Sequence, residues 1–143
     1  MSHHNPGIAI AAEGRMAEAI AHFEHALALN PDDAHAHSNL GTILKMEGRF
    51  DEAMAHFERA LAIRPDYGEA HFHRSEIKSF HPGDADLAVL EALAARDDLS
   101  AAAALPVEFA LAKALEDTGD YARAFEHLRK GNALKRRHGP GSR

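Results

Sequence analysis

The chain has 143 residues, of which 45% are hydrophobic and 27% are charged, a balance that suits one folded domain and excludes wholesale disorder. It has no cysteine, which excludes disulfides, zinc–thiolate sites and cysteine nucleophiles, and this fits the reducing cytoplasm, where we expect the protein. A formal net charge of -6 and the lack of an apolar run of ~18–20 residues predict neither a nucleic-acid nor a membrane partner. No charged segment followed by an apolar one opens the chain, so we expect no secretory signal.

Two segments of the chain are nearly the same. The sequence from residue 13 to 33 reads "EGRMAEAIAHFEHALALNPDD", and 34 residues later the sequence from 47 to 67 reads "EGRFDEAMAHFERALAIRPDY". They agree at 14 of 21 positions. Such a period predicts stacked repeats, because each repeat buries its apolar face only against a neighbour. The abundance of alanine favours helix in each repeat.

The first predicted repeat covers about residues 6–33. A glycine at Gly14 predicts a turn between a short first helix and a second helix over 16–29. Because the first helix is only half the length of its counterpart in the next repeat, it leaves apolar side chains of the second helix partly uncovered, namely Ile20, Phe23 and Leu27. We therefore expect weak self-association through the N-terminal end, or fraying of residues 1–30.

The second predicted repeat covers residues 34–67 and is the most regular. Its first helix carries a stripe at spacings of 0, 3, 4 and 7, and Gly48 ends that helix. The stripe consists of His37, Leu40, Gly41 and Leu44. The second helix, from Phe50 to Ile63, has one broad apolar face, and Pro65 closes the repeat.

The third and fourth repeats cover about 68–104 and 105–138. In the third, "HPGD" and "DDLS" break the chain on either side of a helix over 85–96, and Ser100 is a good helix cap. In the fourth, we expect the main helix to begin at Pro106 rather than at Ala101, since proline disrupts a helix interior. The turn "TGD" precedes a last helix, and we expect residues 139–143 to be a disordered tail, so that residues 1–138 form one domain.

The second repeat resembles a tetratricopeptide repeat, on eight positions at the offsets of that family: Asn39, Leu40, Gly41, Gly48, Ala53, Phe57, Ala60 and Pro65. The resemblance implies an all-α fold, a right-handed α-solenoid of helix–turn–helix repeats with about four helix pairs, the first truncated and the third divergent. It also implies a non-catalytic scaffold that binds a peptide or protein on its concave groove.

The resemblance places the first helix of each repeat along the groove. The flank of these helices beside the core stripe then supplies the expected peptide-binding residues: His35, Ser38, Thr42, Lys45, Glu69, Phe72, Glu76, Phe109 and Lys113. Two readings of Phe72 and Phe109 remain open, exposure in the groove or burial by neighbouring helices.

A narrower resemblance covers roughly residues 68–137. It is similar to the repeat region that precedes the catalytic domain of bacterial tetratricopeptide-containing sulfotransferases. The matching positions are Lys78, Phe80, Asp98-Leu99-Ser100, Phe109-Ala110-Leu111, Lys113-Ala114-Leu115-Glu116-Asp117 and Gly131-Asn132. No Gly-, Ser- and Thr-rich loop of the kind that holds the sulfate donor follows in this chain. The alternative function is therefore the repeat portion of such an enzyme, without its catalytic domain.

The chain contains 12 histidines, which are the candidate metal ligands. His22, His56 and His127 recur at matching repeat positions, and we interpret them as exposed surface residues spread too widely to share one ion. No nucleophile–base signature or paired carboxylates mark a catalytic site. The sequence predicts no metal, no cofactor and no enzymatic activity.

Overall fold

The structure is a computed structural model that describes residues 8–138, with side chains from 14 to 137. These residues form seven α-helices and no strand: α1 (Ile8–Leu29), α2 (Ala34–Met46), α3 (Phe50–Ile63), α4 (Gly68–Ile77), α5 (Ala85–Ala95), α6 (Ala101–Asp117) and α7 (Tyr121–His138). The predicted all-α class, a helical repeat, is confirmed. The expected disordered tail, 139–143, lies outside the described residues.

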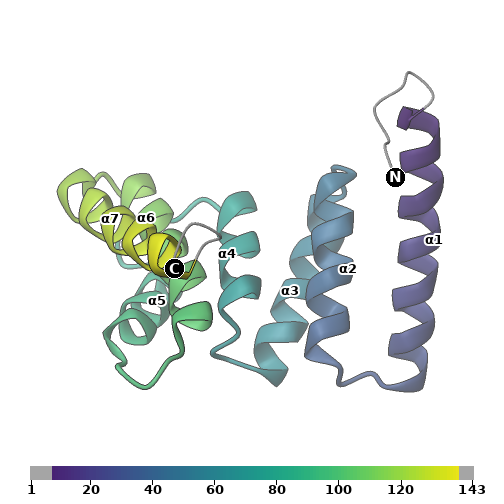
Figure 1. Ribbon diagram of the computed structural model, residues 1–143, viewed down its shortest axis with the longest axis horizontal. Coiled ribbons are helices and arrows are strands. Elements are labelled where there is room, and N and C mark those ends of the chain that lie inside the picture. Colours follow the sequence, from purple (N-terminus) through teal and green to yellow (C-terminus); the bar gives the residue numbers. More distant parts are fainter. Residues whose placement is uncertain (1–7, 139–143) are drawn as a thin grey trace. The chain divides into compact units, whose positions relative to one another are not determined.

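The chain divides into two compact units. The N-terminal unit, Met1–Ile63, holds α1 to α3, and the C-terminal unit, Arg64–Arg143, holds α4 to α7. In the N-terminal unit α2 packs between α1 and α3 (Figure 1). In the C-terminal unit α6 is central, because it contacts α4, α5 and α7.

The predicted turn at Gly14 is wrong, because α1 is one helix of 22 residues that runs through this glycine. A glycine inside a helix costs about 1 kcal/mol relative to alanine. A turn here would leave a very short helix, which is marginal in water, with unsatisfied backbone groups at its ends. Continuing the helix avoids that loss. In α1, Ile20 is buried, while Phe23 and Leu27 are half-buried, in line with the partial cover expected of them.

The α2–α3 pair follows the predicted pattern. The Asp33 side chain accepts a hydrogen bond from the Ala36 N–H and so caps α2. Gly48 ends the helix with a φ of +80°, a left-handed conformation that glycine adopts without strain. The two helices meet where Gly41 faces the ring of Phe57, which is fully buried. A Cβ atom at Gly41 would lie 2.8 Å from the Phe57 ring, so only glycine allows this approach.

The predicted start of a helix at Pro106 is wrong. Ser100 caps α6 through a hydrogen bond from the Ala103 N–H, as the sequence indicated, and the helix then continues from Ala101 through Pro106. The missing proline N–H removes one helical hydrogen bond. Packing offsets this cost, since Pro106 is buried and a Cβ at Gly68 would lie 2.9 Å from its Cγ. Glycine at the start of α4 therefore makes room for the proline ring.

Candidate functional site

The main concave feature of the C-terminal unit is a hollow of about 550 Å³ between α4, α6 and α7. We call it the aromatic groove, and it is lined by Phe72, Phe109, Ala112, Lys113, Glu116, Tyr121, Ala124, Phe125 and Leu128. A second hollow of about 340 Å³ shares Phe72 and Phe109 with it and adds Glu69, His73, Ala102, Leu105, Pro106 and Lys135. Together the two hollows follow most of the length of α6.

Phe72 and Phe109 lie at the junction of the two hollows. Their ring centroids are 6.4 Å apart with an interplanar angle of 57°, which is a favourable aromatic pair. Both side chains are half-buried, so the structure lies between the two readings that the sequence left open. Phe109 is held from behind by Gly131 of α7, where a Cβ would lie only 2.7 Å from its ring.

The α7 side of the aromatic groove carries apolar side chains that are strongly exposed. The exposed fractions are 68% for Tyr121, 62% for Phe125 and 41% for Leu128. The Arg129 guanidinium lies 6.0 Å from the centroid of the Phe125 ring. The groove prediction missed these three residues because they match repeat positions that pack inward. Their spacing of 0, 4 and 7 was the available signal of one shared helix face.

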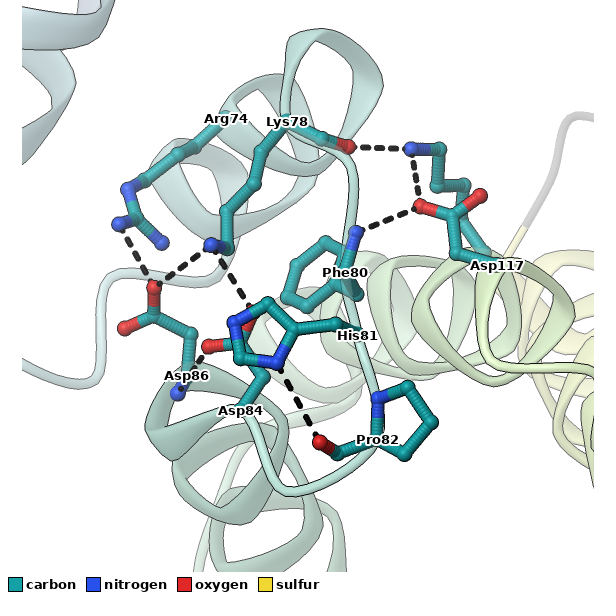
Figure 2. Close-up of polar contacts among 9 residues, drawn as sticks. Arg74, Lys78, Phe80, His81, Pro82, Asp84, Asp86 and Asp117 are labelled. Atoms are coloured by element: carbon teal, nitrogen blue, oxygen red, sulfur yellow. Dashed lines mark hydrogen bonds and ion pairs between the residues drawn. The ribbon is translucent and has the colours of Figure 1, made fainter.

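Lys113 lines the groove, but its ammonium group is bonded within the unit. It donates to the backbone oxygen of Lys78 and to the carboxylate of Asp117, at 2.6 Å from Asp117 Oδ2. The same carboxylate accepts a hydrogen bond from the Phe80 N–H at 3.1 Å (Figure 2). Lys113 and Asp117 therefore hold the segment that follows α4 against α6. The single cation of the aromatic groove is already compensated by a carboxylate.

Charged side chains fix the start of α5 beside this segment (Figure 2). Lys78 Nζ lies 3.0 Å from Asp84 Oδ2 and 3.4 Å from Asp86 Oδ2, and Arg74 Nη2 lies 2.8 Å from Asp86 Oδ2. Asp84 also accepts a hydrogen bond from the Asp86 N–H, which caps α5. The contact with Lys78 lowers the pKa of the Asp84 carboxyl, with a contribution from that backbone bond. The arrangement stabilises the connection between α4 and α5.

The structure brings some of the predicted groove residues together. Phe72, Phe109 and Lys113 line the aromatic groove, and Glu69 lines the second hollow. Glu76 lines neither and lies 3.4 Å from His73 Nδ1.

The other four predicted residues lie on α2, in the N-terminal unit. His35 is exposed, and Thr42 and Lys45 are half-buried. Thr42 donates a hydrogen bond to the backbone oxygen of Ser38 at 2.9 Å. Ser38 itself is only 3% exposed, so its side chain faces the interior rather than a groove. The sequence placed it outside the core stripe, but small residues beside a stripe are covered by adjacent elements.

The histidines are more buried than expected. His127 is 12% exposed and its Nδ1 lies 2.6 Å from Glu108 Oε1, so its predicted surface position is wrong. His56 is half-buried, with its Nδ1 3.1 Å from His37 Nδ1, while His37 Nε2 lies 2.9 Å from the Pro31 oxygen. Burial, and next the charge of His37, lower the pKa of His56. Burial also lowers the pKa of His71, against the effect of its bond to the Pro65 oxygen.

Two searches of the described residues concern other kinds of site. Between residues 8 and 138 no group of three or more histidine, aspartate or glutamate side chains is arranged to hold a metal ion. Over the same range, no helix combines the length and the apolar character that crossing a bilayer requires.

Comparison with known proteins identifies the repeat. The family model described as tetratricopeptide repeat matches residues 11–71, which is less than half of the chain but includes the whole α2–α3 pair. The comparison with curated proteins gives no match. The chain is thus similar to tetratricopeptide-repeat proteins over α2, α3 and the parts of α1 and α4 beside them.

Proposed function

We propose that this chain is a non-catalytic scaffold that binds an amphipathic segment of a partner protein in the aromatic groove. Tetratricopeptide repeats are generally protein-interaction modules, and this supports a partner of that kind. The observation that carries the proposal is the gathering of Phe72, Phe109, Tyr121 and Phe125, from three helices, around one open hollow.

The energetic argument rests on the exposed apolar area of the groove. Burying a large apolar side chain contributes about 1.5–3 kcal/mol relative to leaving it in water. Tyr121 and Phe125 are more than half exposed, so most of that contribution is still available on binding. A helix that presents apolar residues at i, i+3 or i+4, and i+7 would cover such a surface.

The test is a selection from a displayed library of helical peptides randomised on one face, followed by affinity measurements with purified chain. Phe125→Ala should weaken the selected peptides by about tenfold or more, because it removes an exposed aromatic anchor. Phe50→Ala is the matched control, since Phe50 is 52% exposed and lies on α3 of the other unit. Equal binding by both variants would contradict the groove as the binding surface.

The α2 flank is a second proposed contact surface, formed by His35, Thr42 and Lys45. His35 is exposed, and the other two are half-buried. Self-association through α1 also stays a prediction, supported by the partial exposure of Phe23 and Leu27. Sedimentation at several concentrations, with Phe23→Ser as the comparison, tests it. We propose a cytoplasmic location for this scaffold.

The alternative function is the repeat portion of a bacterial sulfotransferase. One observation favours it: the matching residues are physically linked in the structure. Lys113 and Asp117 bind the segment that contains Lys78 and Phe80, and Phe109 packs on Gly131. They therefore define one packing arrangement, which related repeat regions would share. Sequencing the source gene beyond Arg143 tests the alternative, and a stop codon with no phosphate-binding segment downstream would rule it out.

A further inference from the structure

The inference concerns the chemistry of the segment that the aromatic groove accepts, and it rests on the proposed function. The groove combines aromatic rings with two charged side chains, Lys113 and Glu116. The two differ in whether they have partners. Lys113 is bonded to Asp117 and to the Lys78 backbone. Among the described residues, Glu116 is exposed and its carboxylate takes part in no ion pair or hydrogen bond.

The position of Glu116 on α6 makes this lack of compensation unfavourable. Glu116 and Asp117 are the last two residues of the helix, and its last turn contains no basic residue. A negative charge near a helix C-terminus is unfavourable, because the backbone carbonyls there already carry a partial negative charge. Lys113 offsets this for Asp117. Glu116 has no such partner among the described residues, so a cation brought by another molecule would be stabilised beside it.

The aromatic rings favour the same kind of ligand. The faces of phenylalanine and tyrosine rings carry partial negative charge and attract ammonium and guanidinium groups. Within this unit, the Arg129 guanidinium already lies 6.0 Å from the Phe125 centroid. Guanidinium also combines flat stacking with paired hydrogen bonds to a carboxylate, which an ammonium group does not.

We propose that the aromatic groove binds a segment that inserts a basic side chain, preferably arginine, between its aromatic rings and the Glu116 carboxylate. Apolar residues on the same face of the segment cover Phe125 and Leu128. An acidic segment is disfavoured, because the only lysine that lines the groove is already paired with Asp117.

The test uses the displayed helical library in three parallel selections, on the wild-type chain, on Glu116→Gln and on Glu126→Gln. Glu126 is the matched control, because it is an exposed glutamate on α7 that lies outside the aromatic groove. Only peptides that lose binding to Phe125→Ala are counted, so that binding elsewhere does not enter the result.

We expect arginine or lysine to be enriched on the binding face in the wild-type and Glu126→Gln selections. One selected peptide, synthesised with arginine and with glutamine at that position, should bind the wild type about fivefold more tightly with arginine, and Glu116→Gln should lose this preference. Groove-dependent peptides without basic enrichment, or with acidic enrichment, would overturn the inference and leave the proposed function intact. A selection that gives no peptide sensitive to Phe125→Ala would overturn the proposed function itself.

Discussion

The α2–α3 and α6–α7 pairs have the same turn but opposite packing. Gly48 and Gly119, 71 residues apart, end the first helix of each pair with φ values of +80° and +86°. In both turns the next residue donates a backbone hydrogen bond of 2.9 Å to the third-last residue of the helix, Arg49 to Leu44 and Asp120 to Leu115. Local sequence therefore builds the same connection twice.

The contact between the helices is reversed in size. In α2–α3, the small residue Gly41 is on the first helix and the fully buried Phe57 is on the second. In α6–α7, the large Phe109 is on the first helix and Gly131 is on the second. The residue that corresponds to Phe57 is Leu128, which is 41% exposed. Exchanging the large and small partners moves the aromatic ring from the inside of the pair to the wall of a groove.

The first prediction tests this reversal at its largest effect. Phe57→Ala should lower the free energy of unfolding by about 3–5 kcal/mol, because it leaves a cavity where a fully buried ring packed. Leu128→Ala, at the corresponding position, should cost less than about 1 kcal/mol, since the side chain is already partly in water. Urea denaturation followed by circular dichroism measures both. Similar losses for the two variants would show that the pairs pack alike.

The second prediction concerns the small partners. Gly41→Leu should cost about 1–3 kcal/mol, because the added side chain meets the ring of Phe57, which is buried on all sides. Gly131→Leu meets Phe109, which is half-buried beside the groove and can move into it. We expect the second variant to lose less in thermal denaturation. A melting temperature unchanged by Gly41→Leu would contradict the close approach of α2 and α3.

The third prediction compares Thr42 with its counterpart 71 residues later, Lys113. Lys113→Met keeps most of the apolar contact but removes the bonds to Asp117 and Lys78, so it should cost about 1.5 kcal/mol. Thr42→Val removes one local hydrogen bond to the Ser38 oxygen and should cost less than about 1 kcal/mol. Amide exchange of the Phe80 N–H should also rise in Lys113→Met. Unchanged exchange there would contradict the role of Lys113 in holding this segment.

The smallest effect concerns pH and the polar pair in each hairpin, His37–His56 in one and Glu108–His127 in the other. Because the pKa of His56 is lowered on folding, its stabilising contribution is present above the unfolded pKa of about 6.5 and is lost as the pH falls below that value. The lowered pKa of His71 acts in the same direction in the C-terminal unit.

We therefore expect His56→Gln to lose less stability than the wild type between about pH 7.5 and about pH 5.5, with a difference of about 1 kcal/mol or less. Urea denaturation at each pH gives this difference, and His22→Gln, at an exposed position, is the control. If the variant and the wild type show the same pH dependence, protonation of His56 does not oppose folding.

Local patterns predicted most of the helices and turns. Periodic apolar residues, glycine at 48 and 119, and caps at Asp33 and Ser100 act within a few residues of each other, so their effect can be derived from sequence alone. The same reasoning failed at Gly14, because whether a glycine turns the chain depends on what the helix on each side can pack against.

The sequence by itself determined the repeat, the helix–turn–helix pairs and the residue types that face one another across them. Tertiary packing decided that Pro106 lies inside α6, that Ser38 is buried, and that His127 meets Glu108. It also brought Tyr121 and Phe125 beside Phe72 to form the aromatic groove. The physical reason is that these outcomes depend on contacts between helices distant in sequence, where the free space left by one residue determines where another can lie.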